Sequence, residues 1–540
     1  MSARIAQVPT PLNEPVRAYA PGDADRALVL AELDKQSADV MEIPCLIGGE
    51  EVFTGNTVAI RNPSDHSHIL ANVHLAGPDE VNAAVDAAQA ARADWMALSW
   101  EDRAAVLLRA AALLAGPHRA AVNAATMLAQ GKTIYQAEID AVCELVDFWR
   151  FNVKYAADIV ADQPPAHSEG VWNQLDYRPL DGFVFAIAPF NFSSIALNLC
   201  TAPALMGNTV VFKPTLQSMP SVWRMMQVLH EAGMPAGVIN LVNGHGADVG
   251  DIVMSRPELA GVHFTGSTKV FHGLWKQVAN NLDTYRCYPR IVGETGGKDF
   301  IVAHPSADPA ALSVAILRGS FEFQGQKCSA ASRLYVPSNL WESVRDTVCT
   351  EMANMKMGDV RDLSNFIGPV IDERAFRKHQ EYLKIAADTA EIVAGGTSDD
   401  STGWFISPTF VRVTDPKHRL MSEEIFGPIV TVYVYEPEDW EETLELVDTT
   451  SPYALTGALF ARDRAVIAAA SERLRFAAGN YYINDKPTGA VVGQQPFGGG
   501  RASGTNDKAG SPMNLLRWVS PRTIKETMVP ATDWRYPFLD

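Results

Sequence analysis

Short apolar runs alternate with segments of helical periodicity in the middle of the chain. The predicted strands cover residues 182–189, 208–215, 237–244 and 261–266, with helices at 197–206 and 221–232. Strands and helices that alternate at this spacing form right-handed βαβ units, which build a parallel sheet with helices on both faces. Because such sheets bind ligands where their strands end, the polar residues after each run predict a nucleotide site.

A second alternation of the same kind begins near Gly296. Its predicted strands are 299–305, 332–337, 428–437 and 456–461, and its first helix is 310–323. A glycine-rich stretch at 488–512 then carries seven glycines and several apolar side chains. Since glycine lets other groups approach the backbone closely, we expect this stretch to lie against a ligand or another chain; the alternative is a flexible surface loop.

The first part of the chain has the pattern of a polar arm followed by helices. The first forty residues are polar and interrupted by proline, which predicts an arm rather than a core element. Asp79 is the candidate N-cap of a helix whose apolar face carries Val81, Ala84, Val85, Ala88 and Trp95. Further helices are predicted at 102–115 and 140–160, and a short strand at 171–177.

Composition narrows the class of protein. The chain has 540 residues, 47% of them hydrophobic, and a net charge of −18 from 45 basic and 63 acidic side chains. Such a surface repels nucleic acid and anionic membranes, so neither is an expected partner. No apolar run reaches the ~18 residues of a membrane span, and no secretory signal is predicted. The six cysteines form no C-x-x-C pair, which favours reduced thiols and a cytoplasmic location.

Two side chains are candidate reactive groups. Cys328 follows a polar Gln-Gly-Gln-Lys segment, which suits a tight turn or a helix start. A helix N-terminus would lower the pKa of this thiol, whereas the alternative is a buried packing cysteine. Glu294, flanked by glycines in GETGG, is either a turn carboxylate or a general base with open access to water.

Two further polar side chains follow predicted strands. Asn191 either caps the next helix or donates to an oxyanion. Lys213 is either a lysine with a buried stem and a solvated end or a hydrogen-bond donor to a ribose. The dinucleotide fingerprint, the phosphate-binding P-loop and the zinc-protease motif are absent, so no metal site is expected.

Seven segments in order resemble the aldehyde dehydrogenase family. They are APFNF (188–192), FKPT (212–215), FTGS (264–267), GETGGK (293–298), GQKCSA (325–330), EEIFGP (423–428) and PFGG (496–499). The resemblance runs from about residue 45 to the C-terminus. It implies an α/β fold with a Rossmann-like NAD-binding domain that lacks the usual glycine fingerprint, an α/β catalytic domain and a small β oligomerisation element.

The resemblance also implies a reaction. The Cys328 thiolate would attack an aldehyde carbon, and the Asn191 amide with the Cys328 backbone N–H would hold the oxyanion. Hydride transfer to the nicotinamide would leave a thioester. Glu294 would then activate the water that hydrolyses it.

NAD binding is likewise implied by the resemblance. Lys213 and Glu424 would bind the two riboses, and the turn at 266–267 would lie under the pyrophosphate. The full expected set is Ala188, Pro189, Phe190, Lys213, Gly266, Ser267, Glu424 and Phe426. Two positions depart from the family pattern: Leu216 replaces an acidic residue that often selects NAD over NADP, and Phe271 replaces a common glycine, which implies altered packing beside the pyrophosphate.

Segments 13–22, 137–152, 483–499 and 501–508 resemble the branch of the family that oxidises L-glutamate γ-semialdehyde to L-glutamate in proline catabolism. In that branch the anchor loop, 483–499, holds the substrate. By this resemblance the α-carboxylate is bound by the N–H groups of Gly489 and Ala490 and the Ser329 hydroxyl, the α-ammonium faces Glu144, and Phe192 and Phe497 enclose the aliphatic stem. Glu138 and Asp147 compete with Glu144 for the ammonium.

Domain limits and assembly are also expected from the resemblance. The N-terminal arm and first part of the NAD-binding domain would cover 1–161, an oligomerisation hairpin 162–181, the rest of the NAD-binding domain 182–296, the catalytic domain 297–490, and the end of the anchor loop with a C-terminal oligomerisation segment 491–540. A homodimer or dimer-based oligomer is expected. In the bifunctional bacterial form of this branch, the enzyme is fused to a proline dehydrogenase. Because 540 residues leave no room for that second module, functional coupling to a separate proline dehydrogenase is also expected.

Two other functions stay open at this point. The chain could oxidise another small carboxylated aldehyde, such as succinate semialdehyde, which lacks an ammonium group. It could instead be a noncatalytic structural protein that kept the fold. The presence of Cys328, Glu294 and Asn191 together speaks against the second alternative.

Overall fold

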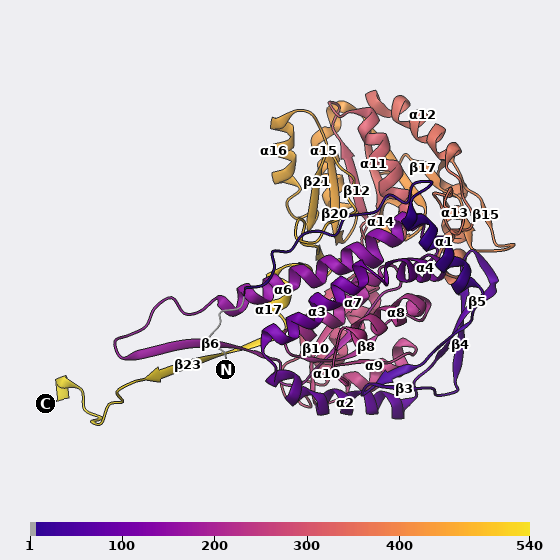
Figure 1. Cartoon of the computed structure of the whole chain (residues 1–540). Helices are drawn as coiled ribbons and strands as arrows, with labels where there is room; N and C mark the ends of the chain where they lie inside the picture. The colour runs from indigo at the N-terminus through magenta and orange to yellow at the C-terminus, as the bar shows by residue number, and fades with distance from the viewer. Residues whose placement is uncertain (1–6, 540) are drawn as a thin grey trace.

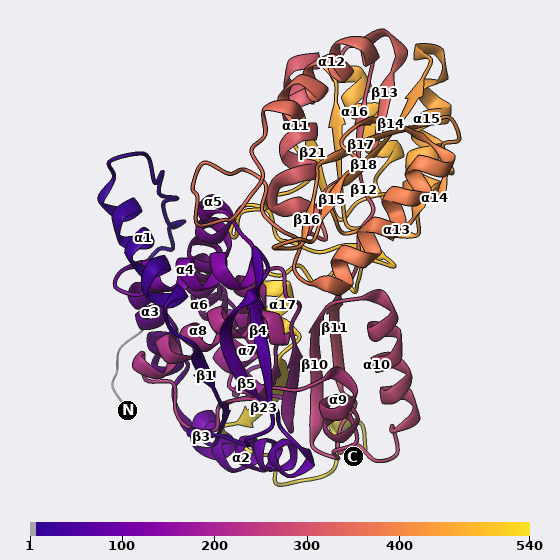
Figure 2. The ribbon, with the colours of Figure 1, turned by 90° about the vertical axis from the view of Figure 1, so that its right-hand side faces the viewer.

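The chain is organised around two seven-stranded sheets (Figures 1 and 2). The computed structural model describes residues 7–539. The first sheet has the order β11-β10-β7-β8-β9-β2-β3. Its strands are β2 (Cys45–Ile47), β3 (Glu50–Val52), β7 (Phe183–Ile187), β8 (Thr209–Lys213), β9 (Ile239–Leu241), β10 (Leu259–Thr265) and β11 (Arg290–Glu294). Strands β7 to β11 are parallel, which confirms the sheet predicted from the alternation at 182–266.

Strand β7 shows why its sequence is apolar throughout. Phe183 and Phe185 pack into the core on one face of the sheet, and Val184 and Ala186 pack into the core on the other. Successive side chains of a strand point to opposite faces, so a strand covered on both sides has no polar positions. The covering helices are α2 (Pro78–Ala97), α9 (Gly246–Met254) and α10 (Thr268–Asn280) on the first face, and α3 (Trp100–Ala115), α6 (Leu145–Ala161), α7 (Ser193–Leu205) and α8 (Met219–Glu231) on the second.

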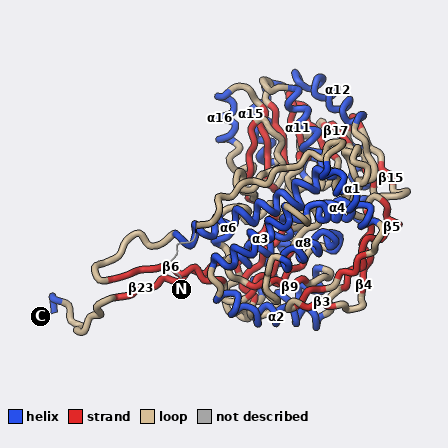
Figure 3. The backbone as a smooth tube through the Cα atoms, viewed as in Figure 1, coloured by secondary structure: helices blue, strands red, loops and turns tan. Residues whose placement is uncertain are grey.

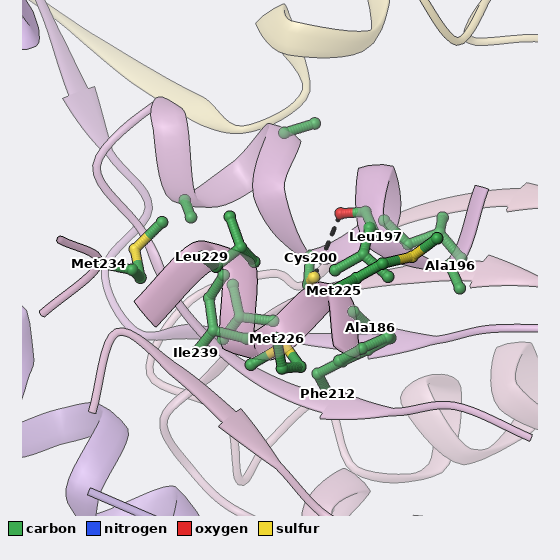
Figure 4. Close-up of a cluster of buried hydrophobic side chains, with 14 of the residues drawn as sticks. Ala186, Ala196, Leu197, Cys200, Phe212, Met225, Met226, Leu229, Met234 and Ile239 are labelled. Atoms are coloured by element: carbon green, nitrogen blue, oxygen red, sulfur yellow. Dashed lines mark hydrogen bonds between the residues drawn. The ribbon is translucent and has the colours of Figure 1, made fainter. Parts of the chain in front are cut away.

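Figure 4 shows part of the core between the first sheet and the helices of its second face, around Cys200. This thiol is fully buried between α7 and α8, and its Sγ lies 3.2 Å from the carbonyl oxygen of Leu197. Ala186 and Phe212 from the sheet and Met225 and Met226 from α8 belong to the same cluster. Cys200 is therefore a packing residue.

The second sheet has the order β14-β17-β18-β13-β12-β20-β21 and is parallel except at β14. Its strands are β12 (Asp299–Ala303), β13 (Ala331–Pro337), β14 (Glu391–Ala394), β17 (Thr409–Val413), β18 (Ile429–Tyr435), β20 (Thr456–Phe460) and β21 (Asn480–Ile483). Helices α11 (Pro309–Phe321) and α12 (Ser338–Asn354) cover one face, and α15 (Trp440–Thr449) and α16 (Arg464–Arg473) cover the other. Helix α13 (Glu373–Thr389) lies beside β14.

A two-stranded ribbon projects from the body of the molecule (Figures 1 and 3). Strand β6 (Val171–Pro179) pairs antiparallel with β23 (Val519–Thr527) along its whole length, from Val171 opposite Thr527 to Pro179 opposite Val519. The strand predicted at 171–177 is confirmed. A separate three-stranded sheet joins β1 (Met41–Ile43), β5 (Asp65–His74) and β4 (Thr57–Asn62).

The expectation of a coreless arm over the first forty residues is wrong for the part that the structure describes, and residues 1–6 lie outside it. Helix α1 (Ala24–Ser37) buries Val29 and Leu33, and Tyr19 is also buried. The polar pattern did not predict this packing, because only a few apolar side chains of the segment are buried. Ion pairs with distant helices hold the rest of it against the body of the protein.

Several helices begin earlier than predicted, and two of them differ in a way that has a clear physical reason or consequence. Helix α2 begins at Pro78 with Gly77 as its N-cap, because the Glu80 carboxylate accepts a hydrogen bond from the Gly77 N–H (2.7 Å); Asp79 is the second helical residue. The five predicted apolar positions of this helix are buried, as expected. The helix predicted at 140–160 begins earlier, at Ile134, and consists of a short α5 (Ile134–Ala137), a π-helical stretch η1 (Glu138–Glu144) and α6.

Among the described residues, no single helix is long and apolar enough to cross a membrane. Helices α3 and α4 (Arg119–Gln130) together reach the length and composition of a span, but they are bent by 76°.

Candidate active site

Cys328 lies in the connection between α11 and β13 of the second half. Phe323 and Gln324 have left-handed backbone angles, with φ of 52° and 55°. The Gln324 amide donates to the carbonyl oxygens of Gly131 (2.9 Å) and Pro369 (2.6 Å), which fixes the connection to both halves of the chain. The glutamines before Cys328 therefore hold an unusual backbone conformation in place.

The structure places Cys328 in a turn and not at a helix start. Burial, followed by the negative charges of Asp299, Glu294 and Glu424, raises the pKa of its thiol well above the usual range. The expected lowering of this pKa by a helix N-terminus is therefore wrong. In the unliganded protein the thiol is neutral at pH 7, so an incoming positive charge is needed to favour the thiolate.

Glu294 is the last residue of β11, so its interpretation as a turn carboxylate is wrong. Its Oε2 accepts a hydrogen bond from the Gly499 N–H (3.3 Å). Burial raises the pKa of this carboxyl well above 4.5, while the Gly499 contact and the charge of Lys508 oppose the rise. A carboxyl with a raised pKa is suited to accept a proton near neutral pH.

Asn191 follows β7, is 97% buried, and donates from Nδ2 to the Gln326 carbonyl oxygen (3.2 Å). It therefore contacts the segment immediately before Cys328. The helix-cap alternative for Asn191 is wrong, because the first turn of α7 is capped by Asp140: its carboxylate accepts from the N–H groups of Ser193 (3.1 Å) and Ser194 (2.9 Å). The amide is free of a capping role and can serve as a donor beside the thiol.

The residues expected to bind NAD gather at the ends of the first sheet. Lys213 ends β8 and donates to the Pro214 carbonyl oxygen (3.2 Å), and burial lowers the pKa of its ammonium group to about 8. The neighbouring segments are joined because Ala188 N–H donates to Lys213 O (3.1 Å) and Thr215 Oγ1 donates to Ala188 O (2.9 Å). In the part of the chain that the structure describes, this buried ammonium has one carbonyl acceptor, which leaves it donors for a hydroxyl-bearing ligand such as a ribose.

Gly266 and Ser267 form the entry to α10, as expected for a pyrophosphate site. A Cβ at Gly266 would lie 2.7 Å from the Phe264 ring, so only glycine fits there. Ser267 is the N-cap and accepts from the Val270 N–H (3.4 Å). Phe271 stacks on Phe264 with ring centres 5.4 Å apart, which accounts for this departure from the family pattern.

Glu424 and Phe426 approach from the second half of the chain. Glu424 Oε1 accepts from the Gly297 N–H (2.9 Å), and a Cβ at Gly296 would lie within 2.9 Å of the same carboxylate. The Phe426 ring meets Phe190 edge to face, with centres 5.8 Å apart. Phe190 follows Pro189 in the first half, so this contact joins the two halves beside the expected cofactor site.

A cavity of about 300 Å³ adjoins Cys328. Its lining contains Cys328 and all six residues expected to bind substrate, namely Glu144, Phe192, Ser329, Gly489, Ala490 and Phe497. The cavity thus brings together Glu144 from the π-helical stretch before α6, Phe192 from the start of α7, the Cys328 loop and the anchor loop. The first half contributes three acidic residues to the lining (Glu14, Glu144, Asp147). The second half contributes three basic residues (Arg318, Lys327, Lys486) and one acidic residue, Glu322, which pairs with Arg318 and Lys327, so its contribution is net basic. This division of charge suits a zwitterionic amino acid.

The three candidate carboxylates for an ammonium group differ in their partners. Glu138 is fully buried in an ion pair with Arg119 and does not line the cavity. Asp147 lines it but already accepts from Asn13 Nδ2 (2.8 Å) and the Glu14 N–H (2.7 Å). Among the described residues, Glu144 accepts only from the Ser194 hydroxyl (3.0 Å), and burial raises the pKa of its carboxyl to about 8. Glu144 has the most capacity left for a cation.

The opposite end of the cavity offers hydrogen-bond donors. Gly489 has φ +89°, a left-handed conformation that glycine adopts without strain. Within residues 7–539, neither the Gly489 nor the Ala490 N–H donates to a protein acceptor. The Ser329 hydroxyl lies 2.8 Å from that of Thr488. Two free N–H groups beside a hydroxyl are the donors that a carboxylate requires.

The sequence did not reveal some residues of the site. Lys132 is buried beside the cavity in an ion pair with Asp140 (2.5 Å), and its ammonium lies over the Phe192 ring. Asn13 and Glu14 line the cavity from the segment predicted to be an arm. The only sequence signals were the Gly-Lys pair for Lys132 and, for Asn13, its place at the start of segment 13–22, which resembles the same branch of the family.

The fold and this constellation of thiol, carboxyl and amide define an oxidoreductase of the aldehyde dehydrogenase type. The model of the aldehyde dehydrogenase family matches residues 52–524, and the chain belongs to this family.

Relatives give a finer comparison. The chain is 51% identical to the mitochondrial delta-1-pyrroline-5-carboxylate dehydrogenase of Dictyostelium discoideum, over 99% of this chain and 96% of that protein. Its fold matches the Mycobacterium tuberculosis delta-pyrroline-5-carboxylate dehydrogenase bound with NAD, with a TM-score of 0.96 and 51% identity over the whole of both chains. It also matches proline utilization A of Bdellovibrio bacteriovorus, with a TM-score of 0.92 and 29% identity, over 97% of this chain and 54% of that longer chain.

Proposed function

We propose that this protein oxidises L-glutamate γ-semialdehyde, formed by opening of Δ1-pyrroline-5-carboxylate, to L-glutamate with NAD, the second step of proline catabolism. The observation that carries the proposal is the single cavity that joins the Cys328 thiol to a carboxylate for an ammonium group and to free N–H donors for a carboxylate. The named relatives support the same substrate.

We assign the two ends of the substrate to the two sides of this cavity. Glu144 faces the α-ammonium group, and the N–H groups of Gly489 and Ala490 with the Ser329 hydroxyl bind the α-carboxylate. Phe192 and Phe497 enclose the aliphatic stem between them. Binding both ends holds the aldehyde carbon at Cys328. The loss of translational and rotational entropy then occurs on binding, which lowers the barrier of the chemical step.

The chemistry then divides among three groups. Cys328 loses its proton and its sulfur bonds to the aldehyde carbon, giving a thiohemiacetal whose oxyanion accepts hydrogen bonds from the Asn191 amide and the Cys328 N–H. NAD, when bound, would accept the hydride that leaves the thiohemiacetal carbon, and its positive charge would favour the thiolate. The resulting thioester is hydrolysed when Glu294 takes a proton from water and the hydroxide adds to its carbonyl carbon. Glutamate leaves, and the thiol regains its proton.

NAD fits the residues at the strand ends. Lys213 and Glu424 would hold the riboses, the Gly266–Ser267 turn would lie under the pyrophosphate, and Ala188, Pro189, Phe190 and Phe426 would complete the site. The buried Lys213 ammonium and the clearance that Gly266 provides are the features that support this fit. Position 216 is leucine, so no carboxylate there discriminates against the NADP phosphate.

The test is a substrate panel on the purified full chain with NAD and NADP. We expect NADH formation with equilibrated Δ1-pyrroline-5-carboxylate at a kcat/KM at least tenfold above that for succinate semialdehyde, which lacks the ammonium group. An equal or higher kcat/KM for succinate semialdehyde would overturn the substrate assignment. No oxidation of any aldehyde, with NAD bound, would favour a structural protein.

We further propose a homo-oligomer, built through the β6–β23 ribbon. Its support is the exposure of large apolar side chains on the ribbon and the tail that follows it, including Trp172, Val529, Trp534 and Phe538. Light scattering that shows a monomer at micromolar concentration would contradict it. The domain limits expected at 161, 181, 296 and 490 belong to the same proposal.

A cytoplasmic location and functional coupling to a separate proline dehydrogenase are also proposals. The reduced thiols support the first, and the match to part of the longer proline utilization A chain supports the second. Cell fractionation tests the location, and the lag in NADH formation from proline when both enzymes are mixed tests the coupling.

A further inference from the structure

The anchor loop that presents the Gly489 and Ala490 N–H groups is held by a residue far away in the sequence. Asn13 Nδ2 donates to the Val492 carbonyl oxygen (2.8 Å), and the Gln494 side chain donates to Asn13 Oδ1 (2.9 Å). Within residues 7–539, every hydrogen bond that joins residues 489–495 to another segment involves Asn13. The remaining bonds of the loop are internal, such as Gln495 Oε1 with the Val491 N–H.

Asn13 is itself fixed on its other side. The same Nδ2 also donates to Asp147 Oδ2 (2.8 Å), and the Glu14 N–H donates to Asp147 Oδ1 (2.7 Å). The Glu14 carboxylate then bridges Arg119 (2.6 Å) and Arg150 (2.9 Å). These buried and half-buried pairs tie the segment to the helices of the first half, so it is a rigid support for the loop.

The same segment forms part of the cavity wall, because Asn13, Glu14 and Val16 line it. Two of the three proposed donors to the substrate carboxylate are backbone N–H groups, which cannot adjust as a side chain can, so the affinity depends on how well this backbone is held in position. Asn13 binds the loop backbone at Val492, two residues after Ala490 in the sequence. Loosening them would cost binding of the substrate carboxylate before it affected the thiol.

We propose that Asn13 is a positioning residue of the substrate site, and that the N-terminal segment 13–16 is a structural part of that site. The inference rests on the proposed function, because it takes the substrate to be an α-amino acid whose carboxylate meets the 489–490 backbone. It assigns a role to a segment that precedes the matched family region at residue 52.

The experiment compares three variants of the full chain with wild type. Asn13→Ala removes the bonds to Val492 and Asp147, and Gln494→Ala weakens the link from an exposed position of the loop. Arg17→Ala is the matched control, because its side chain pairs with Asp25 on the same segment and does not line the cavity. KM and kcat are measured with equilibrated Δ1-pyrroline-5-carboxylate, the Kd of L-glutamate and of NAD by calorimetry, and Tm for each variant.

We expect Asn13→Ala to raise KM and the Kd of glutamate by about tenfold, corresponding to about 1.4 kcal/mol, with kcat and the Kd of NAD within twofold of wild type. Gln494→Ala should raise KM about threefold, and Arg17→Ala should change nothing. An unchanged KM in Asn13→Ala, or a parallel loss of kcat, NAD affinity and Tm, overturns the inference. If Asn13→Ala does not fold, an unchanged KM in Gln494→Ala overturns it. Wild type that fails to oxidise this substrate overturns the proposed function instead.

Discussion

The ammonium group of Lys132 lies 4.4 Å from the centre of the Phe192 ring, which lines the substrate cavity. The same group lies 4.5 Å from the Phe323 ring and 2.5 Å from the Asp140 carboxylate. Asp140 in turn caps the first turn of α7. One buried lysine thus connects the π-helical stretch, the start of α7 and the loop before the thiol, and it supports the aromatic wall from behind by cation–π contact.

Lys132→Met should therefore be destabilising. It leaves the Asp140 carboxylate buried without its cation, a change that costs about 3–5 kcal/mol when a buried ion pair loses one partner. Urea titration followed by intrinsic fluorescence measures the loss, and KM should rise because Phe192 loses its support. Lys35→Met is the control: its ion pair with Glu32 is exposed, and its loss should cost under about 0.5 kcal/mol. Equal stabilities of the two variants would contradict the role of Lys132.

Cys328→Ala should abolish turnover while NAD binding is retained. Loss of a covalent nucleophile lowers kcat by about 10³-fold or more, because no other group can form the thioester. Cys200→Ala is the control, because Cys200 is also a free cysteine but is buried in the core between α7 and α8 (Figure 4). It should lower Tm and leave kcat within a few-fold. Activity retained in Cys328→Ala would show that the nucleophile is misassigned.

The raised pKa of Cys328 has a separate consequence. Because the thiol is neutral in the unliganded protein, its alkylation by iodoacetamide should accelerate with pH across 7–9 without reaching a plateau. Mass spectrometry of the peptide that contains Cys328 follows this rate. A plateau below pH 7 would mean that the thiolate already exists without ligand.

Periodicity was sufficient to predict most of the central fold. Strand β7 is apolar at every position because both faces are covered, and its neighbours have the same signature, so the parallel sheet could be predicted from residues 182–266. The division of the 140–160 helix by a π-helical stretch could not, because α- and π-turns share the same residue preferences. The structured N-terminal segment was missed because Glu14 finds its partners, Arg119 and Arg150, more than a hundred residues away.

The site was predicted mainly from the resemblance to the family, since no local pattern specifies a role for Ser329 or Ala490. The cavity supports that assignment by bringing the two residues together with Cys328. What the sequence could not supply was electrostatics. The pKa of Cys328 depends on Asp299 and Glu424, whose positions follow from the packing of separate strands and loops, and its direction was opposite to the prediction.

Glu144 should give the substrate affinity a distinct pH dependence. Burial, with the nearby charge of Asp140, raises the pKa of its carboxyl to about 8, and the opposing influences are Ser194 and Lys132. Below pH 8 the carboxyl of the free protein is neutral, and it becomes the preferred partner of an ammonium group as the pH rises. The ratio of kcat/KM for wild type to that for Glu144→Gln should therefore increase from pH 6 upward, pass its midpoint near pH 8 and level off about one pH unit above that.

Taking this ratio cancels the titration of Cys328, Glu294 and the substrate itself, which is common to both proteins. Linkage gives an independent check on the same group. The pKa of this carboxyl is higher in the folded protein than in the unfolded chain. The carboxyl therefore lowers the free energy of unfolding of the wild type as the pH rises from about 4.5 to 8. The Tm advantage of Glu144→Gln should accordingly be larger at pH 8 than at pH 5. A ratio independent of pH would remove Glu144 from the ammonium site.

Gly489→Ala tests the carboxylate site through backbone conformation alone. The added Cβ would meet nothing closer than the Lys486 ammonium at 3.5 Å, so the substitution is sterically allowed. The φ of +89° is nevertheless unfavourable for alanine by about 1–2 kcal/mol, and the loop relieves this strain by rotating the 489–490 peptide. KM for Δ1-pyrroline-5-carboxylate should then rise about 5–30-fold, with NAD affinity unchanged. Gly500→Ala is the matched control, because its backbone angle is ordinary and no atom lies within 4 Å of the added group. A KM unchanged in both variants would mean that the substrate carboxylate binds elsewhere.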